Sequence, residues 1–287
     1  MDRIASVYLC HPAVRLLGSD CGSRVPILMY HSVSENQFGK THPYFQINTS
    51  PGIFASQMKW LKRAGYRTMD LTEMLAAMES KKDLSKTIVI TFDDGYRDFY
   101  THAFPVMKQC GFSATVFLAT ARIQNTSLRF EGAEYLTWPE VRELYREGVR
   151  FGSHTVTHAD LHSLDLEQID YELGYSKETI EQELSAAAES FAYSFAFPEE
   201  DNSFKRFLAD ILENHGFDNA VSTILGRAHF SKNRYYLPRL PVNSWDDPKL
   251  LRAKLEGGYD WLHWPQWMNK FMHHNMSLMQ RSSWDGV

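Results

Sequence analysis

Short apolar segments alternate with helical patterns along most of the chain, and this alternation limits the fold more than any other feature. Segments with strand character lie at 25–30, 66–68, 87–92, 114–118, 149–152, 191–197, 220–224 and 235–242. Between them, apolar residues recur at helical spacing. The expected helices include 97–110, 166–188 and 248–255. Strands that alternate with helices predict parallel βαβ units. Roughly seven such units in one chain predict a single-domain α/β barrel, with an open parallel sheet as the alternative.

No internal repeat or low-complexity linker divides the 287 residues. We expect an N-terminal packing segment at 1–24, the barrel at 25–257 and an aromatic-rich tail at 258–287. The tail contains Trp261, Trp264, Trp267, His273 and His274. It either packs on the barrel or mediates association, and the sequence leaves both open. The polar stretch 32–52 is long enough to predict a functional loop.

Composition excludes several classes of function. The net charge of −5 gives no basic footprint for nucleic acid and no polybasic membrane patch. No apolar run reaches the roughly 18 residues of a transmembrane helix. Cys10, Cys21 and Cys110 lack metal-ligand spacing and do not predict a disulfide framework.

Residues 1–18 make a poor secretory signal, so we expect a cytoplasmic protein, with export through a partner system left open. The sequence does not predict the oligomeric state.

The segment 87–92 runs directly into Asp93, Asp94 and Gly95. Its β-branched and aromatic residues favour a buried strand, and Gly95 allows a sharp turn. Two neighbouring carboxylates at a strand end cannot both face an apolar core, because an unpaired buried carboxylate is very costly. A bound cation is the simplest compensation. The alternative is a helix N-cap followed by a solvated turn residue.

Two histidines, His154 and His158, follow the strand predicted at 149–152. Imidazoles four residues apart point the same way if the segment is helical. Two imidazoles and one carboxylate are a common catalytic metal set with open positions for water and substrate. The alternative is a pair of surface or capping histidines. Because the carboxyl ends of barrel strands share one face, we expect the histidine and aspartate pairs to converge with His31 and Pro198.

The two carboxylates and two imidazoles suggest a division of labour. One carboxylate and the imidazoles would hold a cation, which lowers the pKa of water and polarises a carbonyl oxygen. The second carboxylate would take a proton from that water, and an acid would protonate the leaving nitrogen.

Two motifs, Thr91-Phe92-Asp93-Asp94-Gly95 and Ser153-His154-Thr155-Val156-Thr157-His158, resemble those of polysaccharide deacetylases, carbohydrate esterase family 4. Further segments resemble the branch that deacetylates exopolysaccharide: 27–31, 195–198, 216–217, 220–223 and 238–242. The resemblance implies a distorted (β/α)7 barrel. It also implies removal of acetyl groups from N-acetylated sugars with a divalent metal.

The resemblance also implies a role for individual residues. Asp93 would be the general base and His31 the general acid, and Arg239 would hold Asp93 ionised by a charge-assisted hydrogen bond. The metal ligands would be Asp94, His154 and His158, and the substrate would lie near Tyr96, Pro198 and Glu199. The alternatives are a core histidine bonded to backbone for His31 and an ordinary surface ion pair for Arg239.

The third family motif reads Phe-Ala-Tyr-Pro-Tyr-Gly in this branch. When it is placed on Phe195–Pro198, the tyrosine that should follow the proline is missing, because Glu199 follows Pro198. The missing tyrosine forms part of the sugar groove and places a backbone N–H for the oxyanion. Glu199 could still supply that N–H. Its side chain would put negative charge beside the substrate and favour a sugar that carries an amine or another cation. The usual aspartate-tryptophan and leucine-x-histidine motifs are also missing, which leaves His31 as the main candidate acid.

We therefore expect a metal-dependent hydrolase that removes the N-acetyl group from an amino sugar or polysaccharide in surface-polysaccharide biosynthesis. Zinc suits the ligand set, and nickel, cobalt or manganese would also fit. The alternatives are a deacetylase or deformylase of a small or lipid-linked amino sugar, and a non-catalytic carbohydrate-binding relative. Retention of Asp93 argues against the latter, since metal binding alone needs no second carboxylate.

Overall fold

The computed structural model describes residues 2–18, 24–35, 47–130, 132–229 and 233–282, with side chains as far as residue 272. Its centre is a closed ring of seven parallel strands. In ring order these are β2 (Ile27–Tyr30), β14 (Leu237–Pro241), β12 (Asn219–Leu225), β11 (Ser190–Ala192), β10 (Arg150–Ser153), β7 (Thr115–Leu118) and β6 (Thr87–Phe92). The short strand β5 (Arg67–Thr68) adds to the start of β6. The prediction of a distorted (β/α)7 barrel is confirmed.

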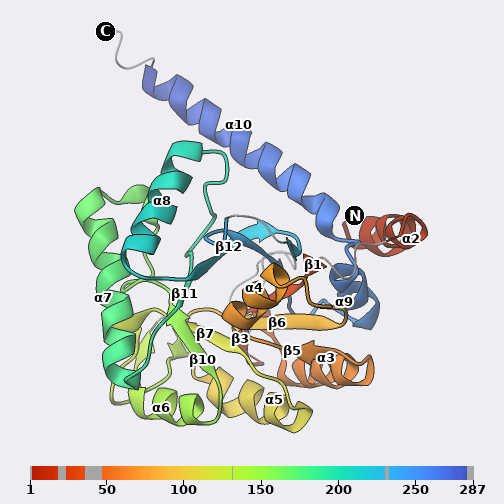
Figure 1. Cartoon of the computed structure of the whole chain (residues 1–287), viewed down its shortest axis with the longest axis horizontal. Coiled ribbons are helices and arrows are strands. Elements are labelled where there is room, and N and C mark those ends of the chain that lie inside the picture. Colours follow the sequence, from red (N-terminus) through yellow and green to blue (C-terminus); the bar gives the residue numbers. More distant parts are fainter. Residues whose placement is uncertain (1, 19–23, 36–46, 131, 230–232, 283–287) are drawn as a thin grey trace.

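Helices surround the barrel (Figure 1). They are α3 (Pro51–Arg63), α5 (Phe104–Cys110), α6 (Trp138–Arg146), α7 (Leu166–Leu184), α8 (Asn202–Asn214) and α9 (Pro248–Leu255). Side chains at their N-caps fix where several of them begin, because each accepts a backbone hydrogen bond from the first turn. Thr137 and Glu140 form the capping box that starts α6.

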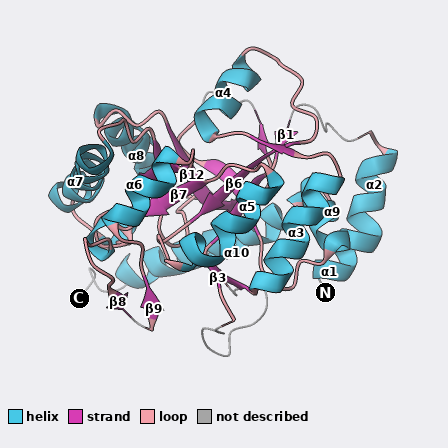
Figure 2. Cartoon of the chain, turned by 90° about the horizontal axis from the view of Figure 1, so that it is seen from below, coloured by secondary structure: helices cyan, strands magenta, loops and turns pink. Residues whose placement is uncertain are grey.

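One further helix, α4 (Leu71–Glu79), closes the end of the barrel where the strands begin. Its buried face, Leu71, Met74, Ala77 and Met78, packs with strand residues such as Val89 and Phe117 in the barrel interior. Figure 2 shows α4 at one end of the barrel, with β3 (Ser32–Val33), β8 (Arg129–Phe130) and β9 (Ala133–Glu134) toward the other. Since α4 closes one end, side chains that follow the strands gather at the opposite end.

The two terminal segments lie beside each other. Residues Asp2–Ala5 (α1), a π-helical turn at Ser6–Cys10 and α2 (His11–Leu16) form the first, and the turn contacts α9. The second is a 3-10 turn at Asp260–Leu262 and the long α10 (His263–Ser282), which extends past α8 (Figure 1). Trp261 Nε1 donates to Ser6 Oγ over 3.0 Å. The boundaries at residues 24 and 257 remain predictions.

No helix among the described residues combines the length and the apolar character needed to cross a membrane. Parts of some predictions fall outside the described residues: Cys21, 36–46 within the loop predicted at 32–52, and the side chains of His273 and His274.

Several expected boundaries were wrong for local reasons. The strand expected at 191–197 ends at Ala192, and Phe195 has a φ of 60°, which a strand cannot contain. The helix expected at 97–110 is divided into a π-helical turn and α5, with Pro105 in the first turn of α5. The helix expected at 166–188 ends at Leu184, because Ser185 is left-handed.

Candidate active site

Asp93, directly after β6, forms a buried ion pair with Arg239 of β14. The guanidinium donates two hydrogen bonds of 2.7 Å, one to each carboxylate oxygen. Arg239 also donates to the carbonyl oxygen of Ser222 (2.9 Å), and 1% of its surface is exposed. This burial excludes the alternative of a surface ion pair. Burial by itself would raise the pKa of Asp93, but Arg239 and the nearby histidines outweigh it and lower that pKa, so the carboxylate is ionised.

His31, directly after β2, faces the same carboxylate. Its Nε2 atom lies 3.9 Å from Asp93 Oδ2, which is too long for a direct hydrogen bond. Burial lowers the pKa of His31, and the carboxylates of Asp93 and Asp94 oppose this shift only in part. His31 therefore lies near a candidate base, with a pKa that makes its protonated form a stronger acid than a free imidazolium.

Asp94 faces two imidazoles. Its Oδ1 atom lies 3.5 Å from His154 Nε2 and 3.1 Å from His158 Nε2. One ligand atom from each residue lies within 4.8 Å of the others. Asp94 Oδ1 is buried and has no aligned hydrogen-bond partner among the described residues, although buried polar atoms are normally paired. An oxygen of this kind beside two imidazole nitrogens fits a divalent cation.

The orientation of His154 supports the same interpretation. Its Nδ1 atom lies 2.7 Å from the carbonyl oxygen of Ala192 in β11. A carbonyl oxygen can only accept, so Nδ1 carries a proton, and in the neutral imidazole Nε2 then offers its lone pair toward Asp94. Metal-binding histidines commonly donate their second ring nitrogen in this way.

Left-handed backbone brings these ligands together. Asp94 (φ 72°), Thr155 (φ 67°) and His158 (φ 64°) all lie in a region that non-glycine residues rarely adopt. The segment from His154 to His158 is a loop, so the condition of a helical segment is not met. The histidine rings nevertheless lie 4.9 Å apart. Strained backbone of this kind is often found at functional sites.

Glu172 of α7 holds that loop and was missed in the sequence. Its carboxylate accepts hydrogen bonds from the backbone N–H groups of Val156 (2.7 Å) and Thr157 (2.9 Å), and from the Thr157 hydroxyl (2.7 Å). Only 6% of Glu172 is exposed. The clue in the sequence is a glutamate in the apolar stripe of α7, next to Leu173 and one turn after Ile169.

Phe195 was also missed as a site residue. It is 54% exposed, and its ring lies edge-to-face on His158 with 4.9 Å between centroids. The third motif also fits four residues earlier, at Phe191-Ala192-Tyr193-Ser194-Phe195-Ala196. In this register Phe195 takes the place of the missing tyrosine, and Ser194 takes the place of the proline. The contact with His158 favours this register over the one that starts at Phe195.

Glu199 has different partners from those expected of a substrate residue. Its backbone N–H donates to Phe197 (2.9 Å), and its carboxylate lies 2.7 Å from His263 Nε2 of α10. This hydrogen bond raises the pKa of His263. Tyr96 lies against Tyr135, and burial with the nearby Asp94 raises the pKa of its phenol. The substrate roles of Tyr96, Pro198 and Glu199 remain predictions.

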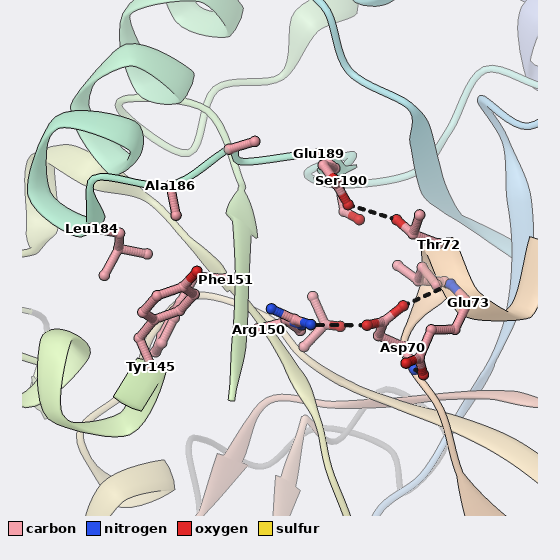
Figure 3. Close-up of a pocket in the computed structure, with 13 residues that line it drawn as sticks. Asp70, Thr72, Glu73, Tyr145, Arg150, Phe151, Leu184, Ala186, Glu189 and Ser190 are labelled. Atoms are coloured by element: carbon pink, nitrogen blue, oxygen red, sulfur yellow. Dashed lines mark hydrogen bonds and ion pairs between the residues drawn. The ribbon is translucent and has the colours of Figure 1, made fainter. Parts of the chain in front are cut away.

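A separate polar pocket lies elsewhere. It has a volume of about 340 Å³ and is lined by residues at the starts of α4, β7, β10 and β11. Figure 3 shows the ion pair of Asp70 with Arg150 (3.3 Å) and the hydrogen bond of Thr72 to Glu189 (2.9 Å) there. These elements begin at the end of the barrel opposite to Asp94. The candidate site is therefore identified by its chemistry and not by the size of a cavity.

Residues 80–220 match the family model described as polysaccharide deacetylase, and this range contains both aspartates and both histidines. The chain carries a polysaccharide deacetylase domain. Two relatives carry names of deacetylases. The chain is 29% identical over 222 residues to YxkH of Bacillus subtilis, which is named as a polysaccharide deacetylase. This match covers 77% of the chain and 72% of the relative. The chain is 24% identical over 230 residues to poly-beta-1,6-N-acetyl-D-glucosamine N-deacetylase of Staphylococcus aureus, covering 75% and 78%.

The deacetylase PplD of Streptococcus pyogenes, solved with acetate, has a similar fold. The TM-score is 0.68 at 24% identity, over 82% of this chain and 99% of that one. The comparisons thus confirm the family resemblance seen in the first two motifs.

Proposed function

We propose that the polysaccharide deacetylase domain is a metal-dependent hydrolase that removes N-acetyl groups from amino sugars in surface-polysaccharide biosynthesis. The observation that carries the proposal is the buried Asp94 Oδ1, 3.5 and 3.1 Å from the Nε2 atoms of His154 and His158, next to a second carboxylate that is buried and ionised. A metal-binding protein without activity needs only the first of these carboxylates. The Staphylococcus aureus relative, named for poly-beta-1,6-N-acetyl-D-glucosamine, suggests the class of substrate.

Asp94, His154 and His158 would hold the cation, for which zinc is the best match to two imidazoles and a carboxylate. Nickel, cobalt or manganese would also fit. When bound, a divalent ion supplies Lewis acidity that activates water and polarises a carbonyl oxygen.

The other side chains would move protons and bind sugar. Asp93 would accept a proton from the water that attacks the acetyl carbon, and Arg239 would keep Asp93 ionised and fixed in orientation. His31 would donate a proton to the amide nitrogen as the carbon–nitrogen bond breaks, so that acetate and a free amine leave. Phe195 would pack its exposed ring against the sugar beside His158.

The test is release of acetate from oligomers of β-1,6-linked N-acetylglucosamine. We expect turnover by the wild type after loading with zinc, and a loss of about 10²–10⁴-fold in Asp93→Asn without loss of bound metal. Asp83→Asn, an exposed aspartate elsewhere, is the matched control and should keep its activity. Thermal melting of each variant would show that it is folded. Absence of turnover in the metal-loaded wild type, or full activity in Asp93→Asn, would contradict the proposal.

A further inference from the structure

Three polar residues of α10 lie on one face of the helix and bind the barrel. His263, Gln266 and Lys270 are three and four positions apart, so their side chains project from the same side. The carboxamide of Gln266 donates to the carbonyl oxygen of Thr223 (2.8 Å) and accepts from the N–H of Leu225 (2.9 Å). One side chain of α10 therefore pairs with the main chain of β12 as a neighbouring strand would.

An irregularity of β12 makes room for this contact. The register of β12 against β14 shifts between Val221 and Leu225, and a bulge of this kind interrupts the ladder of main-chain hydrogen bonds. Gln266 binds within this region and so fixes the position of α10 along the end of β12. The polar residues one turn to either side of Gln266 then reach the segment that follows β11.

The segment between β11 and α8 carries Phe195. This residue has a φ of 60°, which non-glycine residues rarely adopt, and such a conformation persists only when the surrounding structure holds it. Before Phe195, the N–H of Tyr193 donates to the carbonyl oxygen of Val221 (3.1 Å). After it, Phe197 is 1% exposed, and its N–H donates to the Thr223 hydroxyl (2.8 Å). The strained residue is thus held on both sides by β12.

Lys270 adds a contact from α10. Its Nζ atom donates to the carbonyl oxygen of Phe197 over 2.7 Å, two residues after Phe195. A hydrogen bond from an ammonium group is stronger than one between neutral groups. Burial lowers the pKa of Lys270, and the carboxylates of Glu199 and Glu200 oppose that shift. The lysine therefore holds the main chain on the downstream side of the strained residue.

We propose that Lys270 is a positioning residue of the candidate active site, which holds Phe195 against His158 and so shapes the wall that binds sugar. The ring of Phe195 is 54% exposed and lies 4.9 Å from that of His158. Because Lys270 bonds to the main chain beyond Phe195, it acts through Phe195 and not on the reacting atoms. The part in sugar binding rests on the proposed function, whereas the hold on the segment does not.

The experiment measures acetate release by the zinc-loaded full chain from oligomers of β-1,6-linked N-acetylglucosamine. Lys62→Met is the matched control for Lys270→Met, because Lys62 of α3 also donates to a main-chain carbonyl oxygen, that of Gln109 (3.0 Å). We expect Lys270→Met to raise KM about two- to tenfold, with kcat within about twofold of the wild type and unchanged metal content. Lys62→Met should leave KM unchanged.

A double variant tests whether the lysine acts through Phe195. In that case Phe195→Ala/Lys270→Met should have a KM no higher than that of Phe195→Ala alone. Increases that multiply in the double variant would show that Lys270 acts elsewhere and would overturn the proposal. An unchanged KM in Lys270→Met would overturn it as well.

Hydrogen–deuterium exchange tests the hold on the segment without catalysis. Peptides that cover residues 194–199 should exchange about tenfold faster in Lys270→Met than in the wild type or Lys62→Met, because a charge-assisted hydrogen bond is lost. Equal exchange in all three would overturn the proposal. A wild type that releases no acetate would contradict the proposed function, and exchange would still decide whether Lys270 holds the segment of Phe195.

Discussion

Replacement of Arg239 by methionine should destabilise the fold strongly, because it leaves the Asp93 carboxylate buried without its partner. Methionine keeps much of the side-chain volume, so a cavity contributes little. Removing one member of a buried ion pair typically costs about 3–5 kcal/mol, and Asp93 is 2% exposed. We therefore expect Arg239→Met to lower the free energy of unfolding by about this amount at pH 8, measured by urea titration in the presence of EDTA.

The loss should be smaller at lower pH. Without the guanidinium, burial should raise the pKa of Asp93 in the folded state above its value in the unfolded chain. Protonation then favours the folded state, so the destabilisation should shrink as the pH falls from 8 toward 5.

Two further variants make this prediction decisive. In Asp93→Asn/Arg239→Met no charge is left behind, so much of the lost stability should return. Arg97→Met removes a partly exposed arginine that pairs with Glu134 and Glu140, and should cost no more than about 1 kcal/mol. A loss below about 1 kcal/mol in Arg239→Met, or a double variant no more stable than the single one, would refute the electrostatic reasoning.

Three other variants test individual roles. His31→Ala should lower turnover of the amide about 10²–10⁴-fold and affect an aryl ester much less, since that leaving group needs no proton; equal losses on both would contradict the role of His31. Phe195→Ala should raise KM for the glycan about two- to tenfold with unchanged metal content, as expected for one aromatic contact; an unchanged KM would remove Phe195 from the sugar site. Glu172→Gln should weaken metal binding about tenfold or more in a metal titration, because the loop of His154 and His158 loses an acceptor; wild-type affinity would show that the loop holds itself.

Local chemistry made part of the fold predictable. The strand Thr87–Phe92 was expected with the bounds it has, because a run of β-branched residues ends at two carboxylates that cannot continue into the core. Helix Pro248–Leu255 was also expected with its bounds, and Asp247 caps it. Alternation of such elements predicted a barrel with an open parallel sheet as the alternative, and the family resemblance implied the distorted (β/α)7 form.

The convergence of both aspartates and both histidines followed from a single rule, that strand ends share one face of a barrel. The sequence could not show how the ligands reach each other. His154 and His158 meet through left-handed residues in a loop, and that loop is held by Glu172, which is distant in sequence.

The third motif shows the limit of short patterns. Phe-Ala-Tyr and Phe-Ala-Phe lie four residues apart in this chain, and only the contact of Phe195 with His158 distinguishes the two registers. The partners of Glu199 were equally hidden, since α10 lies far along the chain and was expected only as an aromatic-rich tail.

The central claim is that Asp94, His154 and His158 bind a catalytic divalent metal. The most direct test is the metal content of the purified full chain, measured by mass spectrometry for the wild type, His154→Ala and the exposed control His102→Ala. The account predicts about one divalent ion per chain in the wild type and the control, and almost none in His154→Ala. A wild type that takes up no metal after dialysis against zinc, or a His154→Ala variant that keeps its metal, would contradict it.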